Sequence, residues 1–102
     1  MKKLIESTHD TLLEGTSLKI IKFYTEWCAP CKILNPILVN LESSFKNVEF
    51  YECDIETNPA LSVKYKIRSL PTMVFIKDSA ILKEIVGMKT PQYIEATIRN
   101  FI

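Results

Sequence analysis

A nearly continuous apolar run at residues 18–24 restricts the fold more than any other feature of the sequence. The run is rich in β-branched and aromatic residues, which predicts a strand, and Lys22 interrupts it near the middle. A strand with so little alternation between polar and apolar residues is typical of a sheet that is covered on both faces. The chain is therefore expected to fold as an α/β protein around this strand.

Four helices and four further strands are predicted from the rest of the chain. Apolar residues recur every four positions from Ile33 to Phe45, with Leu34 and Leu38 beside them, which predicts a helix with this stripe in the core, and Pro36 should kink it. Strands at 72–76 and 80–86 are joined by a turn so short that they must form an antiparallel hairpin. The remaining strands are expected at 2–6 and 48–54, and the remaining helices at 7–15, at 58–66 and from Thr90 onward.

In sequence order these elements read β-α-β-α-β-α-β-β-α. Parallel βαβ units followed by a hairpin predict an α/β fold with a central mixed sheet of five strands flanked by four helices. Ser7 or Thr8 is expected to cap the first helix, and Asn58 the third. The last helix is expected to turn five residues toward the core, namely Tyr93, Ile94, Thr97, Ile98 and Phe101.

Length and composition predict a single domain over residues 1–102, with 47% hydrophobic residues to fill its core. The net charge is +1, which gives no electrostatic reason to expect nucleic acid or an anionic membrane as a partner. No apolar run approaches the roughly 18 residues that a membrane helix needs. The first residues do not resemble a secretory leader, so a cytoplasmic location is expected.

Cys28 and Cys31 lie where the buried strand ends and the long helix begins. A thiol must ionise before it attacks a disulfide, and the free N–H groups and dipole at a helix start favour the thiolate. Cys28 at the lip of the helix is therefore predicted to be the nucleophile. Cys31, one turn further on, is predicted to resolve the mixed disulfide. The redox group would be this cysteine pair itself, without a metal or another cofactor.

A zinc site is the main alternative for two cysteines spaced in this way. Zinc normally requires four ligands, and the chain offers only Cys53 and His9 besides the pair, neither of them in a second closely spaced ligand pair. Cys53 is expected instead to be a buried free thiol on the other side of its strand from Glu52. His9 is expected to be a solvated surface residue.

The sequence resembles the thioredoxin family over nearly its whole length. Five segments carry the resemblance: Trp27-Cys28-Ala29-Pro30-Cys31-Lys32, Pro36, 54–59, 67–72 and Val86-Gly87. The resemblance implies the thioredoxin fold, with Pro71 as a cis proline that faces the two sulfurs. It also implies that the Leu70 backbone pairs with an extended substrate segment. The apolar rim that receives the substrate would consist of Trp27, Ala29, Pro30, Leu70, Gly87 and Met88.

The function that this resemblance implies is reduction of disulfides in protein substrates, with thioredoxin reductase or an equivalent electron donor to recharge the pair. A monomer is expected, since nothing in the sequence indicates an oligomer. An oxidase or isomerase on the same fold is one alternative, and the reduction potential would distinguish it. A structural binding module is another, for which Cys28→Ser would abolish electron transfer and leave binding intact.

Four positions depart from the family pattern. Ala29 replaces the usual glycine of the active-site tetrad, the turn at Asp78-Ser79 lacks a glycine, and Met88 replaces a shorter residue. The fourth departure is an exchange of charges: Lys22 stands where the family has a buried Asp, and Glu52 where it has the neighbouring Lys.

A lone buried charge of either sign would be costly, so Lys22 and Glu52 are hypothesised to form a reversed ion pair beneath Cys31. In this hypothesis Glu52 would accept the Cys31 proton, directly or through a water, and Lys22 would favour the Cys31 thiolate. The alternative is that Lys22 extends to solvent while Glu52 lies at the strand edge.

Overall fold

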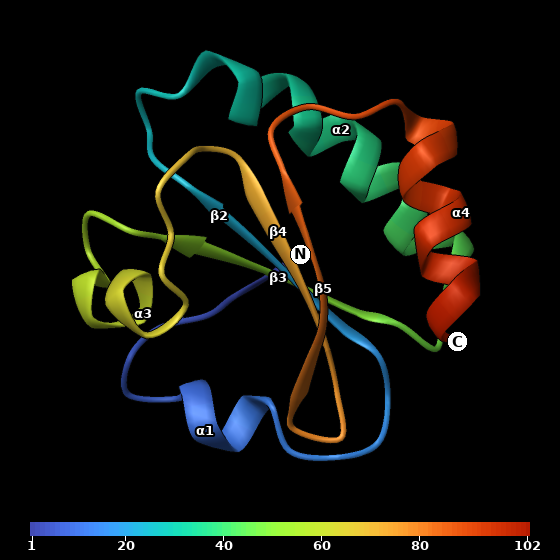
Figure 1. Ribbon diagram of the computed structural model, residues 1–102, viewed down its shortest axis with the longest axis horizontal. Helices are drawn as coiled ribbons and strands as arrows, with labels where there is room; N and C mark the ends of the chain where they lie inside the picture. Colours follow the sequence, from blue (N-terminus) through green and yellow to red (C-terminus); the bar gives the residue numbers. More distant parts are fainter.

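The computed structural model describes all 102 residues and contains one five-stranded sheet in the order β1-β3-β2-β4-β5 (Figure 1). The apolar run forms the central strand, β2 (Lys19–Tyr24). It pairs in parallel with β3 (Glu49–Asp54) and antiparallel with β4 (Thr72–Lys77). The edges are β1 (Lys2–Lys3), parallel to β3, and β5 (Ala80–Val86), antiparallel to β4. The predicted mixed sheet of five strands is confirmed.

Helices cover both faces of this sheet (Figure 1). On one face, α2 (Ala29–Ser44) and α4 (Pro91–Phe101) pack on a core that includes Ile20 of β2. On the other, α3 (Pro59–Lys64) and the chain around α1 (His9–Leu12) pack on a core that includes Ile21 and Phe23. Successive side chains of a strand point to opposite faces, so an uninterrupted apolar run is what this double covering requires.

The helix faces differ from the prediction at two residues. Ile33 is 62% exposed, whereas Leu34, Leu38, Leu41 and Phe45 are buried in the core. Only the first residue of the predicted stripe lies outside the core, since in that turn of α2 the adjacent Leu34 packs into the core. Tyr93 is also exposed, since it lies in the first turn of α4 where Lys89 stacks over its ring.

The predicted helix caps are only partly correct. Thr8 and Asn58 do stand at the N-caps of α1 and α3, but neither side chain makes a capping hydrogen bond. The Asn58 side chain instead accepts from the N–H of Glu6 and donates to the carbonyl of Asp54, which ties α3 to the chain after β1. The first strand is shorter than predicted and ends at Lys3. None of the helices has the length and apolar content that crossing a membrane requires.

Candidate active site

Cys28 is the residue at which the chain turns from the end of β2 into α2. It occupies the N-cap in an extended conformation, and Pro30 follows in the first turn, where its missing N–H costs no hydrogen bond. Cys28 and Cys31 form a disulfide, with their Cα atoms 5.3 Å apart. The N–H of Cys31 donates to Cys28 Sγ over 3.2 Å. A free backbone N–H at a helix start therefore points at the first sulfur, as favours a thiolate there.

The two cysteines differ in exposure. Cys28 is half-buried, whereas Cys31, in the first turn of α2, is only 2% exposed. Only the first sulfur is open to a bulky reactant. The pair is thus arranged for sequential attack, in which one sulfur meets the substrate and the other reacts only with its neighbour.

Three loops converge beside this disulfide. The end of β2 leads into Cys28, and the register Phe23↔Thr72 places the start of β4 next to it. The peptide bond before β4, Leu70-Pro71, is cis, as the family resemblance implies. The loop after β5 joins them, because the N–H of Gly87 donates to the carbonyl of Pro71 over 2.8 Å.

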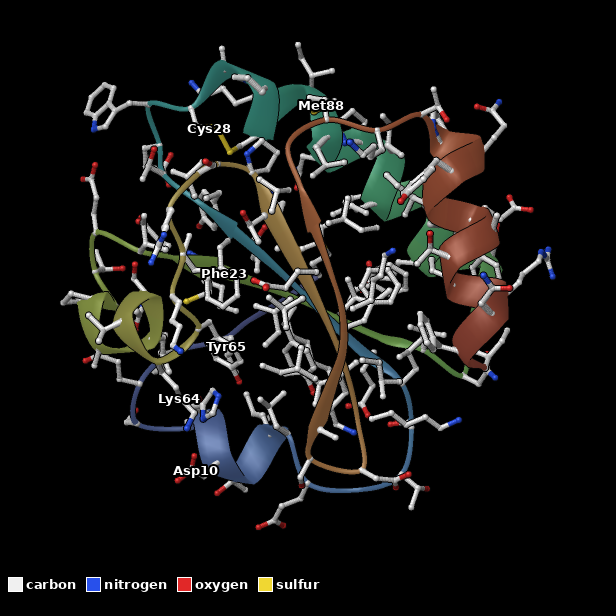
Figure 2. All side chains as sticks on the ribbon, viewed as in Figure 1. Asp10, Phe23, Cys28, Lys64, Tyr65 and Met88 are labelled. Atoms are coloured by element: carbon white, nitrogen blue, oxygen red, sulfur yellow. A yellow bond between two sulfur atoms is a disulfide. The ribbon has the colours of Figure 1, made fainter.

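Several apolar side chains beside the disulfide are exposed or half-buried. Trp27 is 83% exposed and Met88 is 37% exposed, and Leu70 is half-buried. Figure 2 shows Cys28 and Met88 at the same end of the molecule, above the ends of the central strands. Gly87 has a φ of 81°, a conformation that glycine adopts without strain, so the turn into Met88 depends on this residue type. These residues provide an apolar surface that a substrate segment could cover.

Lys22 and Glu52 are directly opposite each other in the parallel register of β2 and β3. Lys22 Nζ lies 3.6 Å from Glu52 Oε2, and the side chains are 4% and 21% exposed, respectively. The predicted ion pair is therefore present, and the alternative in which Lys22 extends into solvent is wrong. Burial lowers the pKa of Lys22, while the attraction of Glu52 opposes that shift.

A pocket of about 290 Å³ joins this ion pair to the disulfide, since its lining includes Lys22, Glu52 and Cys31. Two further polar residues contact Lys22 there: Asn35 Oδ1 accepts from Nζ over 3.0 Å, and the Tyr24 ring lies 4.6 Å from it. Burial, together with Glu52, Asp54 and Glu26, raises the pKa of Tyr24 to about 12. Asn35 was not predicted from the sequence, although its position four residues after Cys31 could have indicated it.

The other two candidate ligands of the zinc alternative lie away from the pair. Cys53 is a free thiol and is fully buried, as predicted, on the opposite face of β3 from Glu52. His9 is only 6% exposed, so its predicted surface position is wrong. Its Nε2 lies 2.5 Å from the Tyr65 hydroxyl and its Nδ1 lies 2.8 Å from Asp10 Oδ1. No group of three or more histidine, cysteine and carboxylate side chains is placed to hold a metal ion.

A cavity of about 400 Å³ beside His9 and Tyr65 is larger than the pocket at the disulfide. It lies at the other end of the molecule, where Figure 2 shows Asp10, Lys64 and Tyr65. It contains no thiol, so the size of a cavity does not identify the reactive site here. The redox chemistry belongs to the smaller pocket and the cysteines above it.

A cysteine disulfide at a helix start, on a mixed sheet covered on both faces, defines a thiol–disulfide oxidoreductase. The family model for thioredoxin matches residues 1–100, and the chain belongs to the thioredoxin family. The thioredoxin of Chlamydia caviae is 34% identical over 89 residues, covering 87% of each chain. That of Chlamydia pneumoniae is 31% identical over 100 residues, covering 98% of each.

Solved structures show the same fold. The thioredoxin of Fasciola hepatica superposes with a TM-score of 0.93 over the full length of both chains, at 27% identity. The oxidised mitochondrial thioredoxin 3 of Saccharomyces cerevisiae gives a TM-score of 0.89 at 30% identity, over 98% of this chain and 94% of that one. The predicted thioredoxin fold is confirmed, and the activity of the chain is thiol–disulfide reduction.

Proposed function

We propose that the protein reduces disulfide bonds in other proteins, with Cys28 as the nucleophile and Cys31 as the resolving thiol. The difference in exposure between the two sulfurs carries this assignment, because a folded protein substrate can reach only Cys28. The hydrogen bond from the Cys31 N–H to Cys28 Sγ supports the same order, since it stabilises negative charge on the first sulfur.

The reaction starts from the reduced pair. The Cys28 thiolate attacks one sulfur of the substrate disulfide, forms a mixed disulfide and releases the other substrate sulfur as a thiolate. The Cys31 thiolate then attacks Cys28 Sγ, so that the Cys28–substrate bond breaks and the Cys28–Cys31 disulfide forms. Two electrons pass from the enzyme to the substrate, Cys31 supplies one proton and the solvent supplies the other, and the substrate leaves as a dithiol.

The apolar rim beside the disulfide is proposed to hold the substrate. The free backbone of Leu70, before the buried Pro71, would pair with an extended substrate segment as an additional strand does. Exposed apolar side chains would cover that segment and keep water from the mixed disulfide. The proposed groove consists of Trp27, Ala29, Pro30, Leu70, Pro71, Gly87 and Met88.

The buried ion pair is proposed to handle the proton of the resolving thiol. Glu52 lies in the same pocket as Cys31 and accepts its proton, directly or through a water. Lys22 keeps Glu52 neutralised and favours the thiolate by its charge. The departing substrate thiolate takes up the proton at the end of the cycle.

The setting is proposed to be a reducing one. Cys53 remains a free thiol in a chain with three cysteines, which suits the cytoplasm. Thioredoxin reductase, or an equivalent electron donor, would reduce the Cys28–Cys31 disulfide after each cycle, so that the protein carries electrons without a metal or an organic cofactor. The protein would act as a monomer.

Reduction of insulin disulfides by dithiothreitol, followed by turbidity, tests the proposal. We expect a rate well above the uncatalysed background for the natural sequence, and a background rate for Cys28→Ser. Cys53→Ala is the matched control, because it removes a cysteine outside the site and should keep the full rate. A background rate for the natural sequence would overturn the proposal. A reduction potential near that of thioredoxin, well below that of disulfide isomerase, would separate a reductase from an oxidase.

A further inference from the structure

The ammonium group of Lys22 is hydrogen-bonded to the same helix that carries Cys31. Lys22 Nζ donates to Asn35 Oδ1 over 3.0 Å. Asn35 follows Cys31 by four residues in α2, and residues with this spacing lie above one another on one face of a helix. The hydrogen bond therefore holds the cation one helical turn from Cys31.

The other contacts of Lys22 do not reach α2. Glu52 comes from β3, and Tyr24 comes from β2 itself. Asn35 is thus the only residue of the helix with a hydrogen bond to the cation. Besides Lys22, the titratable or charged residues that line the pocket with Cys31 are Lys3, Tyr24, Glu26, Lys32 and Glu52.

Resting on the function proposed above, we propose that Asn35 is a positioning residue for the resolving step. It fixes the Lys22 ammonium on the Cys31 face of α2, where the cation favours ionisation of the Cys31 thiol. The ionised thiol then attacks Cys28 Sγ in the mixed disulfide, and the substrate sulfur departs with the bonding electron pair. The proton of Cys31 passes through the pocket to Glu52 and then to the departing thiolate.

Burial makes this geometry effective. The Lys22 side chain is 4% exposed, so water screens its charge weakly. A flexible lysine could direct its ammonium toward several acceptors, and a charge that moves by a few ångströms loses much of its effect on a fixed sulfur. Asn35 removes that freedom, while Glu52 keeps the buried cation neutralised.

The test measures the pH midpoint at which Cys31 ionises, through the ultraviolet absorbance of its thiolate. A Cys28→Ser, Cys53→Ala background leaves Cys31 as the single thiol, with serine where substrate would occupy the first sulfur. Lys22→Met should raise the midpoint by about one unit, a roughly tenfold loss of thiolate well below the midpoint. Asn35→Ala should raise it in the same direction and by a comparable amount.

Three variants separate positioning from a structural effect. Asn35→Met fills the same space without an acceptor and should match Asn35→Ala. Asn35→Gln keeps the amide and should lie closer to the natural residue than to Asn35→Ala. Asn40→Ala is the matched control, because it makes the same change on an exposed part of α2 and should leave the midpoint unmoved.

An unchanged midpoint in both Asn35→Ala and Asn35→Met would overturn the role of Asn35, whatever Lys22→Met does. A midpoint that also moves in Asn40→Ala would do the same, since it would point to a general effect on the helix. The insulin assay on proteins that retain Cys28 separates the two proposals. Full insulin reduction together with an unmoved midpoint overturns this inference alone, and absence of reduction overturns the function on which it rests.

Discussion

The exchange of charges between Lys22 and Glu52 predicts that the two residues are energetically coupled. Lys22→Met and Glu52→Gln each remove one charge with little change in volume, and the double variant removes both. The two residues are directly opposite in the register of β2 and β3, so no other residue pair of these strands can take over the contact. The perturbation therefore isolates one interaction.

The expected coupling follows from the distance and the burial. At 3.6 Å and an effective dielectric constant of about 20, two unit charges attract by roughly 4 to 5 kcal/mol. Partial hydration of Glu52 screens this attraction, and relaxation of the partner left in each single variant absorbs more of it, which leaves a coupling of about 1 to 2 kcal/mol. Glu52→Gln should be the more destabilising single change, because it leaves a buried cation with Asn35 as its main partner.

Urea unfolding of the oxidised proteins, followed by circular dichroism, gives the four free energies of unfolding. The slope of the free energy of unfolding against urea concentration must be the same in all four proteins, so that each difference reports a change in stability. Lys83→Met and Glu84→Gln form the matched control cycle, since these neighbours on β5 are exposed and make no ion pair. Losses at positions 22 and 52 that add to within about 0.5 kcal/mol would refute the coupling.

Two further predictions concern groups outside the redox pair. In the reduced, folded protein a bulky thiol reagent should modify Cys28 and reach Cys53 only after unfolding, because burial, followed by the neighbouring carboxylates, raises the pKa of Cys53 to about 12. Burial opposes ionisation of Glu49, but hydrogen bonds from Ser17, Tyr51 and Lys19 outweigh it and lower the pKa below the usual 4.5. The unfolded state then binds the proton more tightly, so this stabilisation is present above about pH 4.5 and is lost as the pH falls. In Glu49→Gln the free energy of unfolding should therefore fall less steeply as the pH decreases below about 4.5, as measured by circular dichroism.

The central part of the fold could be predicted because its signals are local. The run at residues 18–24 and the cysteines after it depend only on neighbours in sequence, and both lie where they were expected. The exposure of Ile33 at the start of the α2 stripe could not be predicted, because Ile33 and Leu34 are equally apolar and the sheet selects between them. A local pattern thus predicts a helix and its apolar face more reliably than it predicts where along the helix the buried stripe begins.

The polar contacts between distant segments were harder to predict. His9 has polar neighbours in sequence, yet it is buried against Tyr65, which follows 56 positions later. No sequence pattern around either residue predicts that contact. The contact of Lys22 with Asn35 was missed for a related reason: the spacing of Asn35 from Cys31 indicates a shared helix face, but the partner on β2 is known only once β2 is seen to run beneath α2.

The exchanged ion pair separates two requirements that a buried charge must meet. Ile20 and Phe50 pack in the core under α2, and Lys22 and Glu52, two residues further along their strands, point to the same face. Folding requires only that the two charges neutralise each other, and this condition holds whichever strand carries the cation. The acidity of Cys31 depends instead on the sign of the charge held against its helix. Exchange of the two residues can therefore preserve stability while it reverses the electrostatic potential at the resolving sulfur. The double-mutant cycle measures the first consequence of this exchange, and the pH midpoint of Cys31 ionisation measures the second independently.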